Sequence, residues 1–216
     1  MNWLAHIFLA GGDPEDQIGG VLADVLTPRA TAGLSPGVLR GMALHRSLDA
    51  HGDAHPAFLE SCRRLARAGV GLRSLACGVA VDVLYDHVLA SHWEEFCPAV
   101  ALETFAQSFY DAAARHAGEL TPAARTAFIR MAEEDWLSSY REIEGVRVTL
   151  QRIRARLSAR AAEQSPLPAA VEVYQADSAG FEEDFRRFLP AAQAHAAAFL
   201  AEWKSTFAVA GEGAGE

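Results

Sequence analysis

The sequence predicts an all-α fold, built as a single-domain bundle of about seven or eight helices. Apolar residues recur at helical spacing in most of the chain, and Ser-Pro or Thr-Pro pairs precede some of these segments, as is typical of helix starts. Residues 171–174 alone alternate like a strand, and a lone strand has no partner with which to form a sheet. The domain is expected to span residues 1–207, and the small, acidic residues 208–216 are expected to form a disordered tail.

The first half of the chain contains two well-marked helices. Ser35 supplies an N-cap, followed by a proline at the first helical position, for a helix over residues 36–50. The His-Gly-Asp sequence at residues 51–53 is expected to end this helix. Ser74 can cap a longer helix over residues 74–93, which ends before a Cys-Pro pair.

The second half contains four further helices. Thr121, followed by proline, begins the second of them, the Ser-Pro-Leu-Pro sequence at residues 165–168 is a loop, and Pro190 is expected to kink the last. Their apolar positions recur at helical spacing. These positions are Leu102, Phe105 and Phe109; Phe128, Trp136 and Tyr140; Val146, Leu150, Ile153 and Leu157; and Phe181, Phe185, Phe188, Phe199 and Trp203.

The composition suits a chain with a buried core and does not suit a nucleic acid binder. Half of the residues are hydrophobic, and 19 basic residues against 28 acidic ones give a formal net charge of -9. Residues 1–10 lack the basic start and cleavage site of a signal peptide, and the longest apolar stretch, near residues 75–81, is too short to span a membrane. The chain has an odd number of cysteines, and they form no cluster, which favours reduced thiols over disulfides or a zinc site. They are Cys62, Cys77 and Cys97. We therefore expect a soluble, cytoplasmic protein.

The helix over residues 74–93 has two carboxylates in the middle of an apolar face. The opposite face is apolar as well, so the helix is expected to be central and buried all round. Burial of an unpaired carboxylate costs several kcal/mol, so a pair requires raised pKa values or a cation, and a divalent metal supplies this charge most directly. A structural network with Arg40 or Arg46 is the alternative. The residues of the face are Leu75, Val79, Asp82, Asp86, Leu89 and Trp93.

Two other segments place ionisable side chains among apolar residues. His45 and Asp49 share a face with core positions of the helix over residues 36–50, and Asp24 lies within an apolar run. Asp53 and His55 follow closely. Imidazole and carboxylate groups without nearby cysteine suit Mn, Fe, Mg or Zn. Each histidine alone is better explained as a hydrogen-bonded core residue than as a ligand, and Asp49 and Asp53 are equally explained as caps of turns around Gly52. Three such segments together nevertheless favour a metal site.

Four motifs occur in order: MNWLAH at residues 1–6, GGVLAD at 19–24, HRSLD at 45–49 followed by Asp53, and DVLYDHVL at 82–89 followed by His92 and Trp93. In order and spacing they resemble the acyl carrier protein phosphodiesterase family, which is regarded as a divergent branch of the HD phosphohydrolases. The resemblance covers the first 93 residues. Beyond them it rests on length, helical character and the region of residues 136–141.

The resemblance implies a distorted HD-phosphohydrolase-like helical fold and a metal-dependent phosphodiesterase. It implies hydrolysis of the phosphodiester that joins 4'-phosphopantetheine to a serine of holo-acyl carrier protein, with Mn2+ as the metal and Mg2+ or Fe2+ as alternatives. Two departures limit the comparison. HD enzymes have an adjacent His-Asp pair, whereas the adjacent pair here is Asp86-His87, so the metal ligands of ordinary HD enzymes are not carried over to this chain. In addition, Gly19-Gly20 stands where the family pattern is Gly-Asn.

Roles for the motif residues follow from the resemblance and from the chemistry of phosphodiester hydrolysis. One metal ligand is expected from each motif, which gives His6, Asp24, His45 and Asp86. Asp49 or Asp82 would orient a ligating histidine. His87 or His92 would protonate the leaving serine oxygen, and Arg46 would hold the phosphate.

The charge is unevenly distributed along the chain. Residues 62–81 contain four arginines and no acid, and residues 145–162 contain five arginines and no acid, so the rest of the chain carries -18. A local basic patch can attract an acidic acyl carrier protein despite the net charge. The alternative is that these arginines are solvated rows on helix faces. The expected docking residues are Arg63, Arg64, Arg67 and Arg73.

Two other functions remain open at this point. A metal phosphohydrolase of the same fold can act on a nucleotide or another small phosphodiester, since the fold does not determine the substrate. A non-enzymatic helical binding module is the second alternative, with histidines and aspartates that only satisfy one another.

Overall fold

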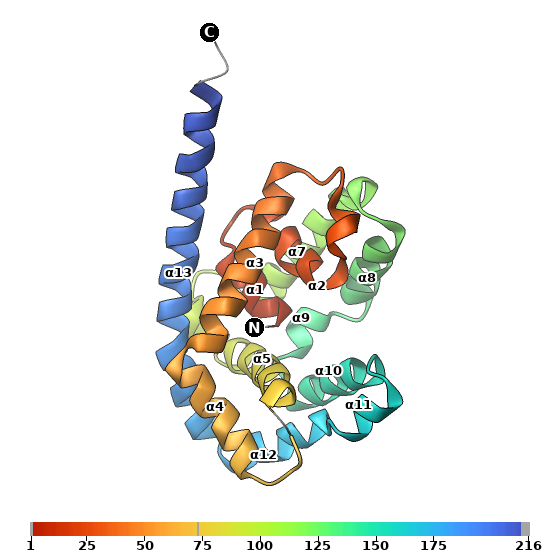
Figure 1. The fold of residues 1–216 in the computed structure, drawn as a ribbon, viewed down its shortest axis with the longest axis vertical. Coiled ribbons are helices and arrows are strands. Elements are labelled where there is room, and N and C mark those ends of the chain that lie inside the picture. Colours follow the sequence, from red (N-terminus) through yellow and green to blue (C-terminus); the bar gives the residue numbers. More distant parts are fainter. Residues whose placement is uncertain (1, 73, 213–216) are drawn as a thin grey trace.

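A computed structural model describes residues 2–72 and 74–212 (Figure 1). All regular elements within these residues are helices, which confirms the all-α prediction. The longer helices of the described chain, each with twelve or more residues, are α2 (Pro14–Val25), α3 (Pro36–Ala54), α4 (Pro56–Arg67), α5 (Ser74–Ser91), α7 (Leu102–Arg115), α8 (Pro122–Glu133), α10 (Ile143–Ala155) and α13 (Ser178–Glu212). The shorter ones are α1 (Trp3–Leu9), α6 (Trp93–Phe96), α9 (Trp136–Ser139), α11 (Ala159–Glu163) and α12 (Ala170–Ala176), with 3-10 turns η1 (Pro28–Thr31), η2 (Ala117–Glu119) and η3 (Leu167–Ala169).

Helix α3 is longer than the sequence predicts. Ser35 caps it as expected, because its hydroxyl accepts a hydrogen bond from a backbone N–H of the first turn. The helix does not end at residues 51–53 but continues to Ala54. Gly52 is buried and faces the Phe188 ring of α13, and this packing holds the helix together through the glycine.

The last two helices also differ from expectation. The strand-like stretch lies in α12, where Val171 and Tyr174 are both buried at the i, i+3 spacing of a helix face. Helix α13 continues through Pro190, as expected, but it reaches Glu212, beyond the expected boundary at residue 207. Residues 213–216 of the expected tail lie outside the described part of the chain.

Helix α5 runs through the middle of the molecule and contacts α1, α4, α10 and α13 (Figure 1). Residues 80–90 are buried apart from the partly exposed Asp82, as expected for a central helix. Leu75 was expected on the buried face, but it is 84% exposed. The first turns of α5 border an open groove instead of another helix, which explains the difference.

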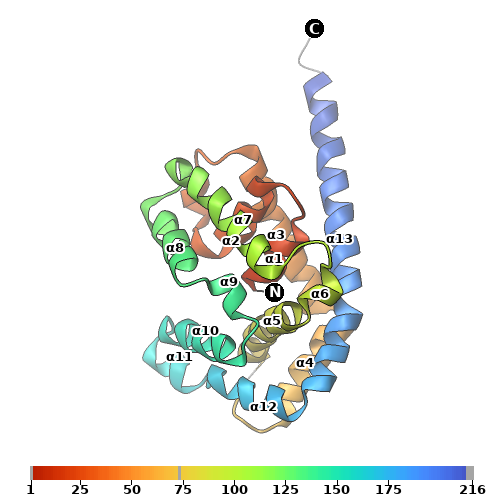
Figure 2. The ribbon, with the colours of Figure 1, turned by 180° about the vertical axis from the view of Figure 1, so that it is seen from behind.

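Helix α13 lies along one side of the bundle. Its first part packs against α3 and α4, and its C-terminal part extends beyond the other helices (Figures 1 and 2). Within the described ranges, no helix combines the length and the apolar character needed to cross a membrane.

Helices α2 and α3 cross with their backbones in direct contact. A Cβ atom on Gly19 would lie 2.2 Å from the Val38 carbonyl oxygen, and one on Gly41 would lie 2.2 Å from the Asp16 carbonyl oxygen. Only glycine permits this approach at either position. The crossing brings the C-terminal half of α2 next to the middle of α3, where the candidate site residues lie.

Candidate metal centre

Four side chains from α1, α2 and α3 meet at one place, and we call them the His–Asp cluster: His6, Asp24, His45 and Asp49. The Nε2 atom of His6 lies 3.0 Å from Asp49 Oδ1, and the Nε2 atom of His45 lies 3.0 Å from Asp49 Oδ2. Asp24 Oδ1 is 3.3 Å from the same His45 nitrogen. The two imidazole rings are stacked, with 3.7 Å between their centroids. The structure thus joins three of the four expected ligands, together with Asp49.

The local sequence explains how the cluster is assembled. His45 and Asp49 are four residues apart on α3 and therefore lie on one face of the helix. His6 lies in α1, a helix of only seven residues that needs tertiary support. Asp24, at the end of α2, is held by a hydrogen bond from the Trp3 indole N–H at 3.0 Å.

Hydrogen bonding determines which His45 nitrogen faces the carboxylates. Nδ1 donates to the Gly20 carbonyl oxygen at 2.6 Å, so Nε2 points at Asp24 and Asp49. A lone pair on Nε2 would be repelled by two carboxylates, and a proton or a metal cation between them removes this repulsion.

The pKa values of His45, His6 and Asp49 are shifted by their burial and by their hydrogen bonds with one another. Burial alone would lower the pKa of His45, but hydrogen bonds with Asp24 and Asp49 outweigh burial and raise it to about 9. Burial lowers the pKa of His6 to about 4. Partial burial opposes ionisation of Asp49, yet its hydrogen bonds with the two histidines hold its pKa well below the usual range. Both carboxylates of the cluster therefore remain negative near neutral pH.

The donor set fits a divalent metal ion. Ligand atoms of His6, His45 and Asp49 all lie within 4.8 Å of one another. The 3.0 Å pairs match the separation of about 3 Å expected for two ligands at right angles, each about 2.1 Å from a metal. Nitrogen and oxygen donors without thiolate suit Mn, Fe, Mg or Zn. The histidines are buried while the carboxylates of Asp24 and Asp49 are 46% and 40% exposed, so the cluster is open to solvent on one side.

Asp86 was an expected ligand, but the structure places it outside the cluster. Its two carboxylate oxygens accept hydrogen bonds from the backbone N–H groups of Leu4 and Ala5, at 2.8 and 3.0 Å. Asp86 is fully buried, and this burial raises its pKa to about 7. It anchors the start of α1 and thereby positions His6.

The two expected general acids face other parts of the molecule. His87 donates from Nδ1 to the Tyr140 carbonyl oxygen at 2.7 Å. His92 lies 3.4 Å from the Glu182 carboxylate of α13. Neither arrangement directs an imidazole to the His–Asp cluster, because His87 is held by the Tyr140 backbone and His92 lies beside a carboxylate of α13.

The expected docking arginines are largely neutralised by acids from elsewhere in the chain. Arg63 and Arg67 both pair with Glu60, and Arg64 bridges Asp177 and the buried Asp184 of α13. Arg73 lies outside the described residues. Arg64 is therefore a structural link between α4 and α13, whereas the Arg63 and Arg67 side chains remain more than half exposed.

A groove of about 650 Å³ begins beside the cluster and runs between α3, α4 and α5. Asp49 and Asp82 line one end, Cys62, Gly78 and Val79 line the middle, and Leu75 lies at the start of α5. Burial raises the pKa of Asp82, and the charges of Asp49 and Asp53 act in the same direction. We call this cavity the α3–α5 groove.

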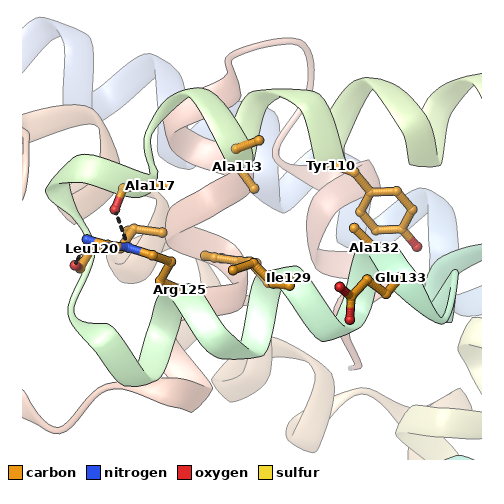
Figure 3. A pocket seen from close by; sticks show the side chains of 10 residues that line it. Tyr110, Ala113, Ala117, Leu120, Arg125, Ile129, Ala132 and Glu133 are labelled. Atoms are coloured by element: carbon orange, nitrogen blue, oxygen red, sulfur yellow. Dashed lines mark hydrogen bonds between the residues drawn. The ribbon is translucent and has the colours of Figure 1, made fainter.

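A second pocket, of about 200 Å³, lies between α7 and α8 (Figure 3). Its lining is almost wholly apolar, with Glu133 as its one carboxylate and no histidine. The Arg125 guanidinium beside it donates a hydrogen bond to the Ala117 carbonyl oxygen. This pocket offers no comparable set of metal donors.

Two contacts of the cluster go beyond the sequence prediction. The contact of Asp49 with His45 fits the orienting role expected for Asp49, but Asp49 also contacts His6 of α1. Residues four apart on a helix meet on one face, so the sequence could indicate the first contact and not the second. Trp3 also contributes, through Asp24, and it lies in the first of the four motifs.

A family model described as acyl carrier protein phosphodiesterase matches residues 1–192. Proteins named acyl carrier protein phosphodiesterase include one from Yersinia pestis, 27% identical over 88% of this chain and 94% of its own length. One from Salmonella agona is 27% identical over 91% of this chain and 98% of its own length. One from Serratia proteamaculans is 29% identical over 66% of this chain and 72% of its own length. No solved structure matches, so the HD-like character of the fold stays a prediction.

Proposed function

The chain belongs to the acyl carrier protein phosphodiesterase family, and we propose from this that it hydrolyses the phosphodiester between 4'-phosphopantetheine and a serine of holo-acyl carrier protein. Water adds across the P–O bond to serine, which yields the serine hydroxyl of the apo protein and free 4'-phosphopantetheine. The match over residues 1–192, with relatives of that name along most of their length, supports the assignment.

We further propose that His6, His45 and Asp49 hold a divalent metal ion, with Asp24 as an additional carboxylate. Mn2+ is the metal suggested by the family resemblance, with Mg2+ or Fe2+ as alternatives. The supporting observation is that the His45 Nε2 atom faces two carboxylates while its Nδ1–H is committed to Gly20. When bound, such an ion lowers the pKa of a water molecule and stabilises negative charge on the phosphoryl oxygens.

Protein residues around the cluster would bind and orient the substrate. Arg46 lies one helical turn before Asp49 on α3, is exposed, and forms no ion pair with residues that the structure describes. Its guanidinium would bind a phosphoryl oxygen. The Gly20 carbonyl fixes the orientation of His45, and Asp86 fixes that of His6 through α1.

A different side chain would protonate the leaving serine oxygen. His87 and His92 face away from the cluster, whereas Asp82 lines the same groove as Asp49. Burial raises the pKa of Asp82, which favours a carboxyl group that keeps its proton and can donate it. We therefore propose Asp82 as the general acid.

The test compares substrates and metals. Purified protein is incubated with holo-acyl carrier protein, or with nucleotides and small phosphodiesters, in the presence of Mn2+ or of a chelator. We expect release of 4'-phosphopantetheine that requires the metal and exceeds hydrolysis of the other compounds. Preferential hydrolysis of a nucleotide would favour the other phosphohydrolase function, and the absence of hydrolysis together with no bound metal would favour a binding module.

A further inference from the structure

The α3–α5 groove is continuous with the His–Asp cluster. Asp49 belongs to both, because it contacts the two cluster histidines and also lines the groove. Any molecule whose phosphate lies at the cluster must therefore extend its remaining atoms either along this groove or out into solvent. The volume of about 650 Å³ is in the usual range for a small-molecule site.

The middle of the groove is mostly apolar, with charged side chains at its borders on α3 and α4, from Asp53 and Arg63. Cys62 and Cys77 are free thiols, and burial raises both pKa values, that of Cys62 to about 12, so they stay protonated. Val79 and the open backbone of Gly78 complete the wall on α5. Such a lining suits a neutral chain with short apolar and amide segments.

The groove does not suit a nucleobase. Phe58 is the aromatic residue in its lining, but the ring is 3% exposed and already packs against Tyr85 and Phe188. A base stacked in the groove would lack a free aromatic face. Leu75 and Leu59, in contrast, expose apolar side chains at the groove that a flexible chain would cover.

The groove is long enough to hold most of an extended arm. Leu75 and Asp82 are seven residues apart on α5, which corresponds to about 10 Å along the helix. The 4'-phosphopantetheine arm has about thirteen bonds from phosphorus to sulfur and spans about 16 Å when extended. An arm with its phosphate at the cluster would leave the serine oxygen next to Asp82, pass Gly78 and bring its thiol end to Leu75 or beyond it.

We propose that the α3–α5 groove binds the pantetheine arm of the substrate, with the scissile phosphate at the His–Asp cluster and the carrier protein outside the groove. This assignment rests on the proposed function. It makes Gly78 and Leu75 determinants of substrate affinity. A folded carrier protein is too large for the groove, so only the arm enters it.

Gly78 provides a direct test, because a Cβ atom there would meet nothing within 4 Å and would point into open space. Gly78→Phe should fill the groove without a backbone clash. Gly118→Phe is the matched control, since Gly118 in η2 also has open space and lies outside the groove. A second pair is Leu75→Ser with Leu157→Ser, two exposed leucines of which only the first lines the groove.

Binding of 4'-phosphopantetheine to the Mn2+-loaded proteins is measured by calorimetry, next to KM and kcat for holo-acyl carrier protein. Circular dichroism verifies folding, and Mn2+ titration verifies the metal centre. We expect Gly78→Phe to weaken 4'-phosphopantetheine binding and raise KM by about tenfold or more, with Mn2+ affinity unchanged. Leu75→Ser should act in the same direction, and both controls should behave as the wild type.

The outcomes separate the two proposals. If the wild type releases 4'-phosphopantetheine but Gly78→Phe and Leu75→Ser bind it as tightly as the controls, the groove assignment is wrong and the proposed function stands. If the wild type does not cleave holo-acyl carrier protein, the proposed function fails and the groove assignment fails with it.

Discussion

Asp49 is the residue whose replacement tests the metal centre most sharply. Its two carboxylate oxygens each lie 3.0 Å from a histidine Nε2 atom, so it connects His6 on α1 with His45 on its own helix. Asp49→Asn keeps the shape of the side chain and removes its charge. One carboxylate, Asp24, then remains in the cluster to balance a divalent cation.

The expected loss of Mn2+ affinity can be estimated from the effect of substitutions around other metal sites. Removing a partner that only orients a metal ligand costs about 10–100-fold in metal affinity. Asp49 supplies a ligand atom itself, so Asp49→Asn should weaken Mn2+ binding by at least about 100-fold, or about 2.7 kcal/mol. The activity on holo-acyl carrier protein should fall in parallel at Mn2+ concentrations that saturate the wild type.

A structural ion-pair network predicts a different result. The Asp49 side chain is 40% exposed, so its pairs with the histidines would contribute only about 1 kcal/mol or less to stability in the metal-free protein. Calorimetric titration with Mn2+ separates the two accounts, with Asp111→Asn on the exposed face of α7 as the matched control. An Mn2+ affinity of Asp49→Asn within about threefold of the wild type would refute the metal-ligand assignment.

Substitutions of three further residues test the supporting structure. Asp86→Asn should lower the free energy of unfolding in urea by about 1–3 kcal/mol and weaken Mn2+ binding. The two Asp86 oxygens accept hydrogen bonds from two backbone N–H groups, and an amide has only one oxygen that can accept. Unchanged stability would contradict its anchoring role. Gly41→Ala should destabilise the protein by about 1–3 kcal/mol in thermal melts, since its Cβ would lie 2.2 Å from the Asp16 carbonyl oxygen. His92→Gln should keep kcat within about twofold of the wild-type value. A fall in kcat of about 100-fold or more would instead indicate that His92 is the general acid.

The helical fold and half of the candidate site could be predicted from spacing along the chain. His45 and Asp49 form a pair because four residues make about one helical turn, and this relation is local. The position of His6 follows from the packing of α1 against distant helices. Spacing alone therefore indicated a shared site without giving the partner of each side chain.

Long-range contacts explain the remaining differences. Helical spacing placed Asp86 on a face with Asp82, but its partners are backbone N–H groups of α1, about eighty residues earlier in the chain. Arg64 lies in an acid-free run of the sequence, yet it pairs with Asp184, which is 120 residues away. Such partners depend on how the helices are arranged, which the periodicity of one segment does not specify.

We propose that this chain cleaves holo-acyl carrier protein at the His–Asp cluster. The most direct measurement follows the intact mass of holo-acyl carrier protein during incubation with Mn2+ and either the wild type or His45→Ala, whose folding is verified by circular dichroism. We predict that the wild type converts the carrier protein to its apo form with release of 4'-phosphopantetheine, and that His45→Ala leaves it unchanged. Conversion at equal rates by both proteins would show that the cluster does not catalyse the cleavage, and conversion by neither would show that the chain lacks this activity.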